Sequence, residues 1–149
     1  MKNVYIANDH AAVDLKNELC DYIESLGFHV INLGTDEKTS VNYPEYAEKA
    51  AKAVLADPGS LGVLICGTGI GVCIAANKVK GVYAALLNNV YQAERAQLSN
   101  NANVITLGAQ VTGIELGKCL VREYLANTYD SASRSGPKVQ AIVEYEAAN

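Results

Sequence analysis

The sequence predicts an α/β protein with a flavodoxin-like (Rossmann-type) three-layer sandwich built around a five-stranded parallel sheet. Strand-like and helix-like segments alternate five times along the 149 residues. The strand-like segments are short, continuous apolar runs, which is typical of parallel strands that helices cover on both faces. Right-handed crossovers turn this alternation into a doubly wound sheet. Five strands fit the flavodoxin-like order better than the six-stranded dinucleotide-binding order.

Each predicted element has a local signal. The strands are the apolar runs over residues 4–7, 28–33, 61–65, 82–87 and 104–107. The helices are expected over residues 15–26, 46–55, 70–78, 91–98, 116–125 and from about 139 to the C-terminus. Gly27 stops the first helix, Pro44 precedes the second, and Gly108 ends the fifth strand. Because no linker or repeat interrupts this order, residues 1–149 are predicted to form a single domain.

Composition narrows the possible functions. Half of the residues are hydrophobic and the formal net charge is −4, which argues against nucleic acid and anionic membranes as partners. No apolar run approaches the roughly 20 residues of a membrane span. The N-terminus lacks a signal-peptide pattern, so a cytoplasmic location is expected. The cysteines and histidines show no metal-ligand spacing, and no nucleotide-binding motif fits, so we expect no metal and no cofactor.

Cys66 directly follows the third predicted strand and begins a turn in which every second residue is a glycine, at Gly67, Gly69 and Gly71. Glycines permit positive φ and let backbone N–H groups approach a ligand, and the following helix adds its positive N-terminal end. Such a turn can hold a phosphate or an oxyanion formed during a reaction, and it favours the thiolate of Cys66 as a base or nucleophile. The alternative is a tight strand-to-helix turn with an idle cysteine, since glycine-rich turns are common in this architecture.

Three further groups of polar residues could meet a ligand. Asp9 and His10 follow the first strand and therefore reach the same sheet edge as the cysteine turn, although Asp9 could also serve only as a helix cap. Tyr43 precedes a predicted helix and could close over a ligand or simply pack. Arg134 and Lys138 lie four positions apart in a late loop and could clamp a phosphate, or remain solvated.

Four stretches of the chain together resemble the RpiB/LacAB family of sugar-phosphate isomerases, which includes ribose-5-phosphate isomerase B and the two subunits of galactose-6-phosphate isomerase. They are NDHAAVDLK, SVNYPEYAEKAAKAV, GVLICGTGIGVCIAANKVKGVYAAL and NNANVITLGAQVTG, and they cover nearly the whole chain in order. The resemblance implies an aldose–ketose isomerase for a sugar phosphate of the ribose 5-phosphate/ribulose 5-phosphate type. The implied mechanism passes through a cis-enediol and uses neither a metal nor a cofactor.

The resemblance also implies a catalytic set of Cys66, Thr68 and Asp9. Cys66 would be the base that moves the proton between C1 and C2, and Thr68 would assist proton exchange at the oxygens. Asp9 would contact the sugar, and the backbone amides of the glycine turn would hold the enediolate. Some family members use a glutamate on the following helix instead. That position is Val72 here, so Cys66 is the only one of the two family positions that carries a possible base.

The substrate-binding residues implied by the resemblance come from two subunits. Tyr43 would contact the sugar and His10 the phosphate. Asn100, Arg134 and Lys138 would reach the same substrate from a partner subunit. The family forms dimers, often tetramers, so the resemblance implies a homodimer or tetramer in which the C-terminal helix contributes to dimer contacts.

The chain departs from the family pattern at three positions. Ser99 stands where a histidine is credited with opening the furanose ring, and Gln110 replaces one phosphate-binding arginine. Lys138 replaces an arginine, which keeps the charge but loses the bidentate fork. Several readings therefore stay open: an isomerase for another, acyclic tetrose phosphate, a subunit of a hetero-oligomeric galactose-6-phosphate isomerase, or a ribose-5-phosphate isomerase with a substitute ring-opening group. A sugar-phosphate-binding regulator is a non-catalytic alternative, although a binder needs no base.

Overall fold

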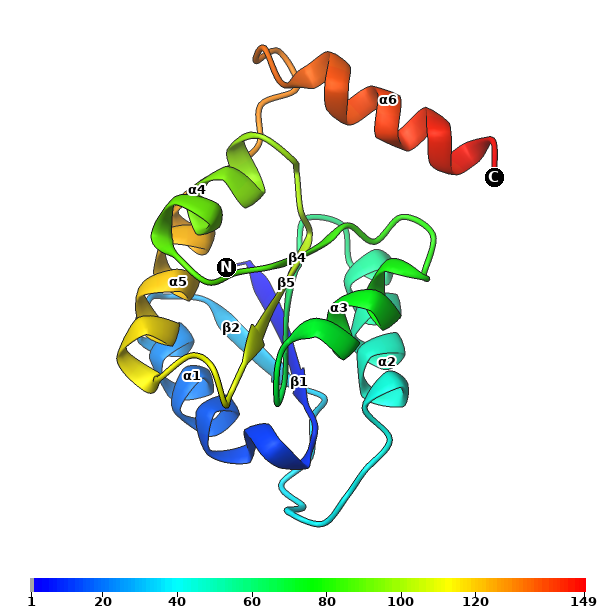
Figure 1. The fold of residues 1–149 in the computed structure, drawn as a ribbon. Helices are drawn as coiled ribbons and strands as arrows, with labels where there is room; N and C mark the ends of the chain where they lie inside the picture. Colours follow the sequence, from blue (N-terminus) through cyan, green and yellow to red (C-terminus); the bar gives the residue numbers. More distant parts are fainter. Residues whose placement is uncertain (1) are drawn as a thin grey trace.

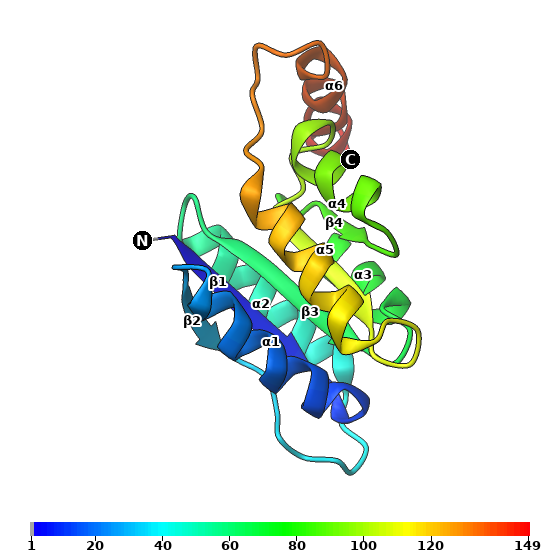
Figure 2. The same ribbon diagram turned by 90° about the vertical axis from the view of Figure 1, so that its left-hand side faces the viewer.

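Figures 1 and 2 show a parallel sheet between two layers of helices, for residues 2–149, which the computed structural model describes. The strands are β1 Asn3–Asn8, β2 His29–Asn32, β3 Leu61–Cys66, β4 Ala84–Leu86 and β5 Val104–Gly108. The helices are α1 Val13–Ser25, α2 Tyr43–Ala56, α3 Ile70–Asn77, α4 Val90–Leu98, α5 Ile114–Ala126 and α6 Gly136–Ala147, with a short 3-10 turn η1 at His10–Ala12.

The sheet confirms the predicted class, with five strands that all pair in parallel, but its last two strands exchange places. The order is β2-β1-β3-β5-β4, whereas the flavodoxin-like order places the fourth strand beside the third. Burial explains the difference. All five residues of β5 are buried, so it takes the interior position beside β3, while the three residues of β4 are only partly buried and form the edge.

The two faces of the sheet carry separate hydrophobic clusters. Helices α1, α4 and α5 cover one face, and α2 and α3 cover the other (Figure 1). Successive side chains of a strand point to opposite faces. In β3, Val63 and Ile65 therefore enter the first cluster, while Leu64 and Cys66 enter the second. This alternation places the Cys66 side chain on the same side of the sheet as α3.

Several boundaries differ from the predicted ones for local reasons. Helix α2 begins at Tyr43, so this residue is the first of the helix rather than part of the preceding loop. Pro44 falls in the first turn, where a missing N–H costs nothing. Helix α6 begins at Gly136, which puts Lys138 in its first turn instead of in a loop. Strand β4 is shorter than predicted because Val82 donates its N–H within a turn, to the carbonyl of Val79.

Helix α6 stands apart from the two helical layers, beyond the end of the sheet opposite to the carboxyl ends of β1 and β3 (Figures 1 and 2). Near its C-terminal end, Glu146 accepts hydrogen bonds from the Tyr83 hydroxyl at 2.7 Å and from the Gly81 N–H at 3.2 Å. Burial, with this carboxylate beside the ring, raises the pKa of Tyr83 to about 12. Of the helices described, none is both long and apolar enough to pass through a bilayer.

Candidate active site

The turn between β3 and α3 is organised around the sulfur of Cys66. The backbone N–H of Gly69 donates a hydrogen bond to Sγ at 3.1 Å, and Thr68 Oγ1 accepts the N–H of Ile70 at 3.2 Å. Donation to the sulfur stabilises negative charge on it. Within residues 2–149, the backbone N–H groups of Gly67 and Thr68 donate no hydrogen bond. The two N–H groups that directly follow Cys66 in the chain are therefore available to an anion.

Gly69 explains why this turn needs glycine. It adopts a φ of +78° as the N-cap of α3, and a Cβ there would lie 2.6 Å from the Leu86 side chain and 2.8 Å from the backbone of Leu107. The turn is held from the neighbouring strand, because the Thr106 hydroxyl donates to the Gly69 carbonyl at 2.9 Å. The position of the Cys66 sulfur is thus fixed by buried backbone rather than by a mobile loop.

Cys66 opens into a cleft of about 460 Å³ at the carboxyl ends of β1 and β3. The residues that line this cysteine cleft are Asp9, Tyr43, Cys66, Gly67, Thr68, Ile70, Gly71 and Ile74. The predicted catalytic set is therefore brought together in one chain, and Tyr43 and two of the turn glycines join it. Ligands of doubly wound sheets bind at this end of the strands.

Asp9 and His10 enter from the end of β1. Asp9 Oδ1 accepts the Ala11 N–H at 3.0 Å, so the expected capping role is present together with a place in the cysteine cleft. His10 does not line the cleft but follows Asp9 directly. Its Nδ1 accepts the N–H of Val41 at 3.2 Å, so the neutral imidazole carries its proton on Nε2 as a donor.

Tyr43 lies over the first turn of α3. A Cβ added to Gly71 would lie 2.5 Å from Cζ and 2.8 Å from the hydroxyl of Tyr43, so the ring occupies the space that a larger residue would need. The absence of a side chain at this glycine lets an aromatic ring and its hydroxyl form one wall of the cysteine cleft. Both alternatives for Tyr43, packing and ligand contact, are thus compatible with its place.

The other predicted site residues gather in a second cleft, of about 410 Å³, at the start of α6. Its lining residues are Ser99, Asn100, Arg134, Ser135, Lys138, Val139 and Ile142, and we call it the cation cleft. In residues 2–149, Arg134 and Lys138 form no ion pair. Two uncompensated cations at the positive end of a helix favour an anion such as a phosphate.

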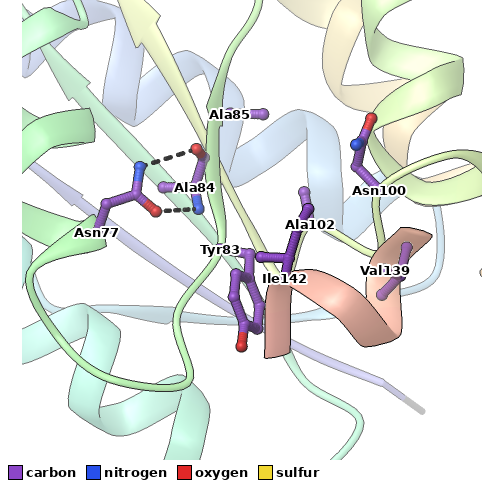
Figure 3. Close-up of a pocket in the computed structure, with 8 residues that line it drawn as sticks. All are labelled: Asn77, Tyr83, Ala84, Ala85, Asn100, Ala102, Val139 and Ile142. Carbon is purple, nitrogen blue, oxygen red and sulfur yellow. Dashed lines mark hydrogen bonds between the residues drawn. The ribbon is translucent and has the colours of Figure 1, made fainter. Parts of the chain in front are cut away.

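A third cavity, of about 320 Å³, lies next to the cation cleft and is drawn in Figure 3. Its lining residues are Asn77, Tyr83, Ala84, Ala85, Asn100, Ala102, Val139 and Ile142. The Asn77 carboxamide bridges to the backbone of Ala84 and closes one side, while Ile142 of α6 closes the other. The cavity is mostly apolar and has no charged side chain in its lining.

Within one folded subunit, the cysteine cleft and the cation cleft lie at opposite ends of the sheet. The cysteine cleft lies at the carboxyl ends of β1 and β3, whereas α6 stands beyond the other end of the sheet (Figure 1). A single chain does not bring Arg134 or Lys138 to Cys66. Among residues 2–149, no group of three or more histidines, cysteines and carboxylates could hold a metal ion.

Sequence reasoning missed two residues of the cysteine cleft, Ile70 and Ile74. Both are exposed, at 52 % and 57 %, one helical turn apart on α3. Their spacing was visible, but α3 is apolar along almost its whole length, so periodicity did not separate an inward from an outward face. The two isoleucines give the cysteine cleft an apolar rim.

Comparisons with known proteins show which family and fold this chain resembles. A family model described as Ribose/Galactose Isomerase matches residues 4–142. The chain is 43 % identical to a D-erythrulose-4-phosphate isomerase of Pectobacterium atrosepticum, over 98 % of this chain and 96 % of that protein. It is 47 % identical to D-erythrulose-4-phosphate isomerase 2 of Mycolicibacterium smegmatis, over 77 % and 74 %. The solved structure of Clostridium thermocellum ribose-5-phosphate isomerase B is similar with a TM-score of 0.92, 37 % identity and 98 % coverage of both chains.

Proposed function

The chain belongs to the ribose/galactose isomerase family of sugar-phosphate aldose–ketose isomerases, and we propose that Cys66 is the base of its reaction. The observation that carries this proposal is the position of Cys66, which lines the cysteine cleft and whose sulfur accepts a backbone N–H from the turn that follows. A turnover screen with tetrose, pentose and hexose phosphates tests it. Conversion of at least one of them by the purified chain is expected.

The proposed reaction moves one proton between adjacent carbons of the open-chain sugar. The Cys66 thiolate removes the proton from the carbon next to the carbonyl, and the electron pair moves onto the carbonyl oxygen to give an enediolate. The free N–H groups of Gly67 and Thr68 stabilise that oxyanion. The Thr68 hydroxyl moves a proton between the two oxygens. Cys66 then returns a proton to the neighbouring carbon. Asp9 and Tyr43 orient the sugar hydroxyls within the same cleft.

Phosphate binding is the proposed role of His10 and of the cation cleft of a second subunit. His10 offers its Nε2–H as a donor, and Arg134 and Lys138 offer charge. We therefore propose a homodimer or larger oligomer in which the cation cleft of one subunit, with Asn100, Arg134 and Lys138, meets the partner's cysteine cleft. The separation of the two clefts within one chain supports this arrangement. Since a phosphorylated sugar does not cross a bilayer unaided, a cytoplasmic location follows from the proposal.

Ser99 favours an open-chain substrate for this isomerase. A five-carbon aldose phosphate closes into a furanose, and the ring must open before the carbon acid forms. A serine hydroxyl hydrogen-bonds but is not a base near neutral pH by itself, whereas histidine is. A four-carbon sugar with its phosphate on O4 has no hydroxyl left to close a five-membered ring. Similarity to two D-erythrulose-4-phosphate isomerases supports the same substrate class, and a galactose-6-phosphate isomerase subunit remains the alternative.

Ser99→His is expected to raise turnover of the cyclic substrate selectively. Ser99 lies in the cation cleft beside Asn100, so an imidazole there faces the proposed substrate. A positioned acid–base group contributes about 10²–10⁴-fold. We expect kcat/KM for ribose 5-phosphate to rise at least about tenfold relative to a tetrose phosphate. Ser99→Ala is the control. Efficient use of ribose 5-phosphate by the parent, unchanged in Ser99→Ala, would show that another group opens the ring.

Removal of metal ions is expected to leave turnover unchanged. The proposed step needs only a thiolate and backbone donors, and the described residues contain no cluster suited to a metal ion. Activity measured before and after prolonged incubation with a chelator, followed by dialysis, checks this expectation. A lasting loss that added divalent metal restores would contradict the metal-free mechanism.

A further inference from the structure

Lys16 on α1 is a charged side chain with no exposed surface, at 0 %. Its Nζ donates to Oδ1 of Asp36 at 2.7 Å, and Asn17 donates to the same oxygen at 3.3 Å. The Asp36 side chain is 75 % exposed, and donation by Lys16 lowers the pKa of its carboxyl group. Lysine is rarely buried completely, and a buried charge costs desolvation free energy that its partner must offset. The burial of Lys16 therefore points to a role of the Lys16–Asp36 pair other than stabilising the fold.

Asp36 belongs to the loop between β2 and α2, whose two ends lie against the end of β1. At the start of the loop, the buried Asn8 side chain donates to the Thr35 carbonyl and accepts the Thr35 N–H, both at 3.0 Å. At its end, Val41 donates to His10, and Tyr43 follows with its ring over α3. The loop thus connects the Lys16–Asp36 pair, which we call the loop anchor, to His10 and Tyr43 of the proposed active site.

We propose that Lys16 is a positioning residue that acts on the active site through this loop. Val41 follows Asp36 by only five positions, so a change in the path of the chain at Asp36 is carried to the His10 contact and to Tyr43. Lys16 itself does not line the cysteine cleft and touches no reacting atom. The inference rests on the proposed function for the roles of His10 and Tyr43.

Lys16→Met tests the proposal, because methionine keeps the length of the side chain and removes the charge without leaving an unpaired partner in the interior. We expect KM for the sugar phosphate to rise about tenfold, since misplaced binding groups weaken substrate binding. We expect kcat to stay within about threefold, because Cys66 and Thr68 are held by the β3–α3 turn. The melting temperature is expected to be unchanged or higher. A merely structural role would instead lower the melting temperature and leave KM as it was.

Hydrogen exchange of the Val41 amide gives a readout that does not depend on activity. In Lys16→Met this amide is expected to lose protection as its bond to His10 opens. The double variant Lys16→Met/Asp36→Ala should show nearly the same KM and the same exchange as Lys16→Met, because Lys16→Met already breaks the ion pair and Asp36 keeps only a long, exposed contact with Asn17. Lys38→Met is the matched control. Lys38 pairs with Asp14 at 3.1 Å, also between this loop and α1, but both side chains are exposed, so neither readout should change.

Unchanged KM or full protection of Val41 in Lys16→Met overturns the proposal, as does an equal effect of Lys38→Met. The two readouts also separate this inference from the function on which it rests. If the parent converts no sugar phosphate while Val41 loses protection in Lys16→Met, the proposed function fails and the loop anchor stands. If the parent is active and Val41 keeps its protection, the anchor fails and the isomerase stands.

Discussion

Replacing Cys66 with alanine is expected to lower kcat by a factor of about 10²–10⁴, the usual contribution of a general base. The sulfur is the only group with base chemistry in the β3–α3 turn, and Val72, on the following helix, is an apolar residue that is buried. The Asp9 carboxylate already accepts a backbone hydrogen bond and is expected to orient the sugar. Steady-state kinetics with the best substrate of the screen measure the loss.

Substrate binding by Cys66→Ala should remain close to that of the parent, because the binding groups come from other residues. Titration calorimetry of the variant with the sugar phosphate checks this. Cys73→Ala is the control, since Cys73 lies on α3 outside the cysteine cleft and contacts the Ala84 carbonyl. Near-parental turnover by Cys66→Ala, or an equal loss in Cys73→Ala, would remove Cys66 from the reaction.

Mixing two inactive chains is expected to restore activity if the site is shared between subunits. One chain carries Cys66→Ala and the other carries Arg134→Ala and Lys138→Ala. In a two-fold symmetric dimer, each mixed dimer contains one site with an intact Cys66 from one chain and an intact Arg134 and Lys138 from the other. Full exchange of equal amounts makes half of the dimers mixed, so the mixture should show about a quarter of the parental rate. The physical reason is the separation of the two clefts within one chain.

Subunit exchange must be verified independently, for example by mass spectrometry of the intact mixed dimer. The control mixture combines two chains that carry the same Cys66→Ala change, and it should stay inactive. If verified mixed dimers of the two complementary chains have no activity above that control, Arg134 and Lys138 do not serve a neighbour's site. The proposed shared site would then be wrong.

The elements of the fold were predictable because their signals are local. Apolar runs mark the strands, and Gly27 does stand just beyond the end of α1. The exchange of β4 and β5 was not predictable in this way. It depends on which of two apolar runs is buried more deeply, and that is decided by packing between distant segments. The start of α2 was misjudged by three positions because Pro44 fits inside a first helical turn.

The cysteine cleft was predictable from the rule that ligands meet the carboxyl ends of parallel strands, which brings Asp9 and Cys66 together. The remaining features depend on contacts that no local pattern encodes. Glu146 meets Tyr83 across more than sixty positions of the chain and holds the far end of α6. Lys16 looks like an ordinary surface lysine in the sequence, and only the structure reveals that it is buried against Asp36.

The central claim is that the Cys66 sulfur breaks the C–H bond next to the carbonyl. The most direct measurement follows deuterium placed on C2 of the aldose phosphate and counts its loss from C2, whether to C1 or to solvent. Counting both destinations detects bond cleavage even when net conversion is slow. The account predicts that the parent releases the label at the rate of turnover, and that Cys66→Ala binds the sugar but leaves the label on C2. Release of the label by Cys66→Ala at the parental rate would contradict the account.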